Sequence, residues 1–163
     1  MEHNSPRRKG SRRRLWVWAS VATILVCATS ALALTKIHNI SSAPQGDRPE
    51  CTKVASLAPG KVSDKTRDWT LGNGVAAWGN ASAVLRCGVS ELPPTTNLCI
   101  AAEGIDWVLD EERLEREGVS ALRTYGRAPA IEFTYYGPRE DVGGILVELK
   151  SAIDWIPQNS KCT

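Results

Sequence analysis

The sequence is poor in the side chains that most often carry enzyme chemistry. It has two histidines among 163 residues, His3 and His38, together with one methionine and one phenylalanine. Residues 51–163 therefore contain no histidine, which excludes a Ser–His–Asp triad or a Cys–His pair from that part of the chain. The G-x-S-x-G, Walker and H-E-x-x-H motifs are absent as well. Nothing in the sequence indicates a cofactor.

The cysteines indicate disulfides rather than a metal site. Cys51, Cys87, Cys99 and Cys162 are an even number in a small region, which is typical of an oxidising compartment. They form no C-x2-C pair and have no nearby histidine, so we predict no bound metal. Of the three possible connectivities we favour Cys87–Cys99, which would close a short proline-containing loop, and Cys51–Cys162, which would join the ends of the domain.

The first third of the chain is typical of a membrane-targeting segment. Six basic residues and one acid occupy residues 1–14, and Leu15–Leu34 follows without a charge. Twenty apolar residues span a bilayer as a helix, and the basic cluster stays on the cytoplasmic side. We predict a transmembrane signal anchor at 15–35, with cleavage as a signal peptide at Ala31-Leu32-Ala33 left open. The least favoured alternative is a lipoprotein attached at Cys27, because lipid attachment requires a small residue before the cysteine and Val26 occupies that position.

The predicted signal anchor places the rest of the chain outside the cytoplasm. Residues 36–50 are polar and contain Pro44, Gly46 and Pro49, so we predict a linker, followed by a domain at 51–163. We expect a single-pass membrane protein, secreted if the signal is cleaved. Six of the 20 Lys and Arg residues but one of the 18 acids precede the apolar run, so the remainder carries about −3. Binding to nucleic acid is therefore not expected.

Apolar spacing in residues 51–163 predicts an α+β domain. A short helix at 51–58 precedes an irregular stretch at 60–74. Strands are expected at 84–89, 100–109, 121–125 and 130–136, the first two as an antiparallel hairpin. Residues 110–117 predict a charged helix that ends at Gly118, and apolar residues from Val142 to Ile156 predict an amphipathic helix over 140–156. We expect two disulfides and a sheet of three to four strands, with the N-terminal and C-terminal helices packed on it.

Four residues are candidates for a binding surface. Arg86 and Arg127 lie close to aromatic residues in strand-like segments, and a guanidinium can grip a carboxylate or phosphate. Trp78 and Tyr125 are the neighbouring aromatics. We favour the structural alternatives, which are core packing for the tryptophan and, for each arginine, an ion pair across the sheet with Asp106, Glu103 or Glu132. An enzyme hypothesis would use Asp106 with either arginine on an anionic substrate.

Several strings together resemble the DUF3515 family, a family of uncharacterised exported or membrane-anchored actinobacterial proteins. They are Ala77-Trp78-Gly79, Val84-Leu85-Arg86-Cys87-Gly88-Val89, Gly104-Ile105-Asp106-Trp107 and Thr124-Tyr125-Gly126-Arg127-Ala128-Pro129-Ala130. The resemblance covers residues 51 to about 158. It implies a place in the cell envelope and no particular activity.

Three functional hypotheses follow. The first is a non-catalytic binding or accessory module of the cell envelope that contacts cell-wall material or another membrane protein. The second is the envelope enzyme that uses Asp106. The third is a subunit of a membrane complex whose anchor helix makes the contact.

Overall fold

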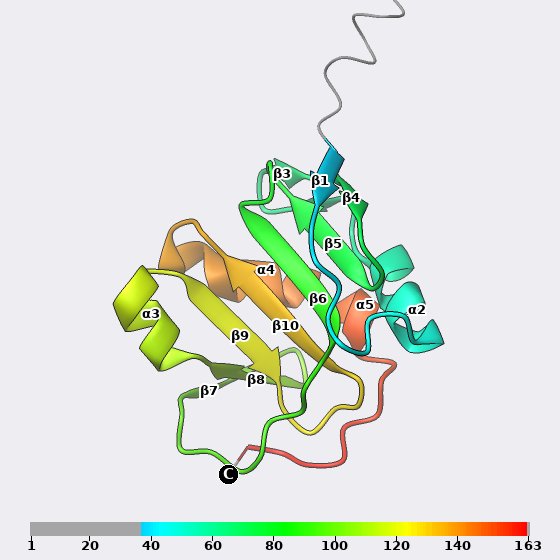
Figure 1. Cartoon of the computed structure of the whole chain (residues 1–163). Coiled ribbons are helices and arrows are strands. Elements are labelled where there is room, and N and C mark those ends of the chain that lie inside the picture. Colours follow the sequence, from blue (N-terminus) through cyan, green and yellow to red (C-terminus); the bar gives the residue numbers. More distant parts are fainter. Residues whose placement is uncertain (1–36, 163) are drawn as a thin grey trace, which may run out of the picture. The chain divides into compact units, whose positions relative to one another are not determined.

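The computed structural model describes residues 37–162, and the folded unit of the chain begins at Ile37. Its centre is a six-stranded antiparallel sheet in the order β5-β6-β10-β9-β8-β7 (Figure 1). The α+β class and two disulfides agree with the prediction, but the sheet is larger than the expected three to four strands. The strands are β5 (Val75–Trp78), β6 (Ala83–Val89), β7 (Cys99–Ala102), β8 (Ile105–Leu109), β9 (Ser120–Thr124) and β10 (Ala130–Tyr135).

The predicted strand at 100–109 is two strands. Glu103 and Gly104 both have positive φ, 50° and 81°, which is the backbone of a two-residue hairpin turn. The chain therefore folds back, and β7 pairs with β8. The expected hairpin between 84–89 and 100–109 is wrong, because β6 pairs with β5 and β10 instead.

Small elements extend the domain before the large sheet. β1 (Ile37–Asn39) pairs in parallel with β4 (Trp69–Leu71), and β2 (Lys61–Val62) pairs with β3 (Lys65–Thr66). These pairs occupy parts of the chain predicted as linker and as irregular. The chain after β1 also contacts the large sheet, since the Gln45 amide donates to the Gly88 carbonyl at 3.0 Å. Residues 37–48 are thus part of the compact unit.

The helices follow the sequence pattern with changed limits. α2 (Pro49–Leu57) begins two residues before the predicted start. α3 (Glu111–Glu117) is capped by Asp110, whose side chain accepts from the Arg113 amide, and it ends at Gly118 with φ of 69°. The expected continuous helix at 140–156 is divided into the 3-10 turn η1 (Arg139–Asp141), α4 (Val142–Glu148) and α5 (Lys150–Ile153).

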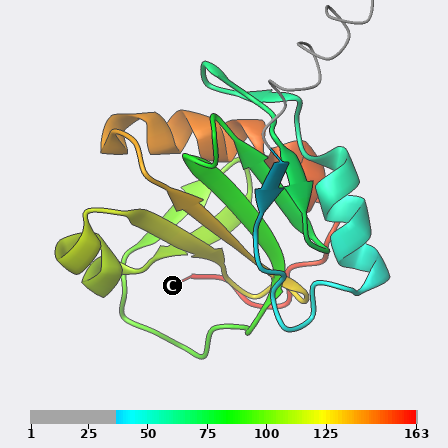
Figure 2. The same cartoon turned by 45° about the horizontal axis from the view of Figure 1, so that its top comes forward.

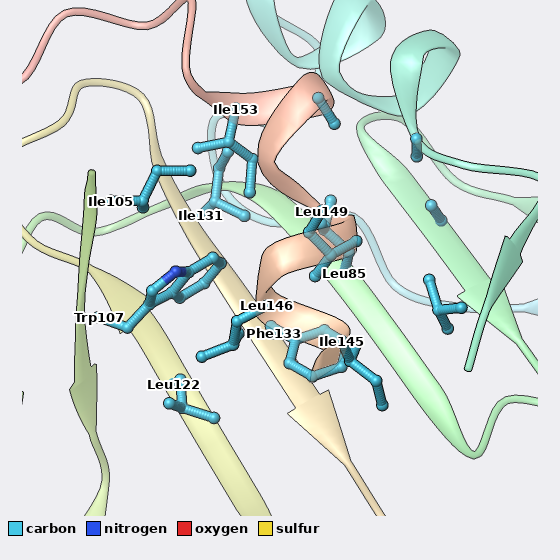
Figure 3. Close-up of a cluster of buried hydrophobic side chains, with 14 of the residues drawn as sticks. Leu85, Ile105, Trp107, Leu122, Ile131, Phe133, Ile145, Leu146, Leu149 and Ile153 are labelled. Carbon is cyan, nitrogen blue, oxygen red and sulfur yellow. The ribbon is translucent and has the colours of Figure 1, made fainter. Parts of the chain in front are cut away.

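The core lies between the sheet and the helices α4 and α5 (Figures 1 and 2). All six residues of the predicted C-terminal apolar stripe are buried: Val142, Ile145, Leu146, Leu149, Ile153 and Ile156. Alternate strand residues such as Leu85, Phe133, Leu122 and Trp107 meet this stripe from the sheet (Figure 3). Residues between them in sequence point to the opposite face, which carries the polar side chains of Arg86, Glu132 and Arg123.

Candidate functional site

Trp78 is a core residue. It has no exposed surface, and its indole nitrogen donates to the Pro59 carbonyl at 2.8 Å. The Arg67 guanidinium lies 5.8 Å from its ring and donates to the carbonyls of Ala55 and Ala58. Trp78 thus ties the turn after α2 to β5 and has no surface to offer a ligand.

Arg127 is also buried, with 5% of its surface exposed. Its guanidinium donates to the Ile156 and Gly104 carbonyls and more weakly to the Asp154 carbonyl, at 3.5 Å. It also donates to the side-chain oxygen of Gln158 at 3.3 Å. Burial lowers the pKa of Arg127, while nearby carboxylates act in the opposite direction. These bonds fasten the C-terminal segment to the sheet.

Asp106 belongs to the same structural network. One of its carboxylate oxygens accepts from the Gln158 side-chain nitrogen at 2.8 Å and from the Cys162 amide at 2.9 Å. Gln158 therefore bridges Asp106 and Arg127, the two groups that the enzyme hypothesis combined. Tyr125 lies beside this network and lines a polar pocket of about 390 Å³ with Cys99 and other residues.

Both predicted disulfides are wrong. The bridges are Cys51–Cys87, with a Cα–Cα distance of 5.2 Å, and Cys99–Cys162, at 6.4 Å. The physical reason is the turn at Glu103-Gly104. It leaves β7 at the sheet edge opposite β5, away from the neighbours of β6, so Cys87 and Cys99 cannot meet.

Arg86 joins a charged row on the sheet face opposite α4 and α5. Glu132 of β10 is in register with Arg86 of β6 and Arg123 of β9. One carboxylate oxygen of Glu132 accepts from Arg86 at 3.0 Å, and the other accepts from Arg123 at 3.2 Å. We call these three residues the arginine row. Part of the structural alternative, a cross-strand ion pair for Arg86, is confirmed.

A pocket adjoins each end of the arginine row. One, of about 240 Å³, is lined by Arg123 and by two carboxylates, Glu132 and Asp110, together with Leu92, Asn97 and apolar residues of β8 and β9. The other, of about 340 Å³, is lined by Arg86, Thr134 and Tyr136 with residues 39–41.

Two polar groups on this face lack partners. The Nε of Arg123 and the hydroxyl of Thr134 are buried and make no hydrogen bond within residues 37–162, although such groups are normally paired. Thr134 is 1% exposed and lines the second pocket. The face therefore holds unused hydrogen-bonding capacity beside two cavities.

Sequence reasoning missed Arg123 and gave Glu132 only as one of several partners for Arg86. The available signal was strand alternation, since Glu132 lies between the apolar residues Ile131 and Phe133, and Arg123 follows the apolar residue Leu122.

Within residues 37–162, no group of three or more His, Cys, Asp or Glu side chains is placed to hold a metal. Across the same residues, no helix is both long and apolar enough to cross a bilayer. The predicted anchor at 15–35 lies outside the described residues.

The chain was compared with known proteins. A family model described as "Protein of unknown function (DUF3515)" matches residues 15–160. No curated protein and no solved structure matches.

Proposed function

We propose that this chain, which belongs to the DUF3515 family, is a membrane-anchored extracytoplasmic module that binds an anionic group of the cell envelope without catalysis. The apolar run at 15–34 behind a basic cluster supports the anchor. The two disulfides support an oxidising compartment. The arginine row supplies the binding surface, in place of the surface around Trp78 and Arg127 that the sequence suggested.

One observation carries the proposal: two guanidinium groups share a single carboxylate on a sheet face with pockets at both ends. The arginine row has a net charge of +1. Arg123 keeps its Nε donor free. A guanidinium can bind a carboxylate or phosphate through two parallel hydrogen bonds. The second pocket contains Arg86 and the unpaired Thr134 hydroxyl, and no acidic side chain is among the described residues that line it, so we place the anion there.

The enzyme hypothesis gains no support from the geometry. Asp106 accepts two hydrogen bonds that hold the C-terminal segment, and Arg127 donates to backbone carbonyls. Neither group lines the two pockets beside the arginine row. Both side chains therefore have structural roles within the described residues.

The test is co-sedimentation of the oxidised domain, residues 37–163, with purified cell-wall material. We expect the double variant Arg86→Gln/Arg123→Gln to lose pelleting. Glu132→Gln should pellet more strongly, because it removes the negative charge between the two arginines.

A charge-matched control separates the arginine row from general attraction. Lys53→Gln/Lys61→Gln also removes two positive charges, but from exposed positions on α2 and β2. We expect this variant to pellet as the wild type does. Equal losses in both double variants, or full pelleting without the two arginines, would refute the proposed surface.

If pelleting is absent in the wild type too, the partner is not wall material, and crosslinking of the full-length chain would identify a membrane protein. Replacing Leu15–Leu34 with an unrelated anchor would then test the subunit hypothesis.

A further inference from the structure

The β1–β4 pair carries an apolar patch in contact with solvent. Ile37, Trp69 and Leu71 are 61%, 72% and 57% exposed. Ile37 is directly in register with Trp69, and Leu71 is two residues further along β4. Since alternate strand residues point the same way, the three side chains share one face of this two-stranded sheet. We call them the β1–β4 patch.

The exposed side of this strand pair is its more apolar side. The alternate residues His38 and Thr70 are half-buried, so the pair turns its more polar side inward and its larger apolar side chains outward. The other tryptophans of the described chain are buried or half-buried. A cluster of large apolar residues on a surface marks a contact with a partner or a membrane.

The position of the patch in the chain identifies the contact. Only Thr35 and Lys36 separate Leu34, the end of the apolar run, from Ile37, where the compact unit begins. Three residues of fully extended chain span at most about 11 Å. Ile37 is therefore held within that distance of the point where the proposed anchor leaves the hydrocarbon. Tryptophan is enriched at this depth because its ring is apolar and its N–H remains hydrated.

We propose that the β1–β4 patch inserts into the headgroup region of the lipid bilayer that holds the anchor. This inference rests on the proposed membrane anchoring, and it adds a second attachment made by the folded domain itself. Figure 1 shows β1 and β4 side by side at one end of the domain, with the C-terminal end of the described chain at the other. Attachment through both the anchor and the patch would restrict rotation of the domain about its tether.

The experiment uses full-length protein reconstituted in phospholipid vesicles whose acyl chains carry bromine, a short-range quencher of tryptophan. Trp16→Phe/Trp18→Phe removes the two tryptophans of the apolar run. In this background we expect bromolipid to quench part of the remaining emission. The quenched part should be lost in the additional variant Trp69→Phe.

A second exposed position supplies the control. Leu98 is 51% exposed and precedes β7, at the sheet edge opposite β5. Leu98→Trp combined with Trp69→Phe should be quenched by aqueous acrylamide and not by bromolipid. Equal bromolipid quenching at both positions would show general contact with the vesicle and refute the patch.

Flotation of the same vesicles tests the anchor separately. Protein that floats while Trp69 is insensitive to bromolipid would overturn the patch and leave the anchor standing. Trp69 shielded from both quenchers would place a protein surface on the patch and refute lipid contact. Protein that fails to float would refute both proposals.

Discussion

A substitution of Arg127 tests most directly whether this residue stabilises the fold or binds a ligand. The variant Arg127→Met keeps much of the side-chain volume and removes every donor. The carbonyls of Ile156 and Gly104 then lose charge-assisted hydrogen bonds in a buried place. Leaving a buried carbonyl without its donor costs about 1–3 kcal/mol, and two carbonyls lose their donor here. We take about 3–4 kcal/mol as the expected loss in free energy of unfolding, because the bond to Asp154 is long.

Urea denaturation of residues 37–163 with intact disulfides measures this loss. Arg123→Met is the matched control, since its side chain is 30% exposed and its ion pair with Glu132 should be worth about 0–1 kcal/mol. Hydrogen exchange gives a second readout. The Cys162 amide, bonded to Asp106, should exchange faster in Arg127→Met and normally in Arg123→Met.

The two methionine variants could prove equally stable, or Arg127→Met could unfold as the wild type does. Either result would mean that the guanidinium does not hold the C-terminal segment. Arg127 would then return as a candidate ligand-binding residue.

Two further predictions concern the disulfides and alkaline stability. In residues 37–163, Cys99→Ala/Cys162→Ala should leave no free thiol in a thiol assay and lower the free energy of unfolding by up to about 4 kcal/mol, from closure of a loop with a separation of 63 residues. Two free thiols would instead support the pairing predicted from sequence. Burial raises the pKa of Tyr135, and its hydrogen bond to Asp141 adds to this effect. The unfolded chain therefore loses this proton first, so stability from Tyr135 is fully present below the ordinary tyrosine pKa of about 10 and declines above it. Tyr135→Phe should flatten this decline in urea titrations above that pH, and an unchanged decline would contradict the assignment.

Local patterns in the sequence predicted several elements well. β6, β9 and β10 were expected from runs of β-branched and apolar residues, and the stripe on α4 and α5 from its helical period. Asp110 and Gly118 mark the ends of α3 in the sequence as they do in the structure. These features depend on neighbours in the chain, which a sequence displays directly.

The features that the sequence did not predict either lack a local sequence signal or depend on residues far apart in the chain. β5 is buried at all four positions, so it lacks the alternation that identifies a strand. The turn at Glu103-Gly104 places a non-glycine residue at positive φ, outside the usual Asn-Gly and Asp-Gly signals. The arginine row could not be assembled because it requires β10 to lie between β6 and β9, and this strand order is set by the packing of the whole sheet.

The connectivity of the disulfides also bears on biogenesis. Cys51 joins Cys87 and Cys99 joins Cys162, so each bridge closes a stretch of chain that does not overlap the other. In a chain exported from the anchored end onward, Cys51 and Cys87 emerge before either of the later cysteines. If the chain is exported in this direction, as proposed, oxidation in order of emergence would give the native pairs without exchange of mispaired bridges.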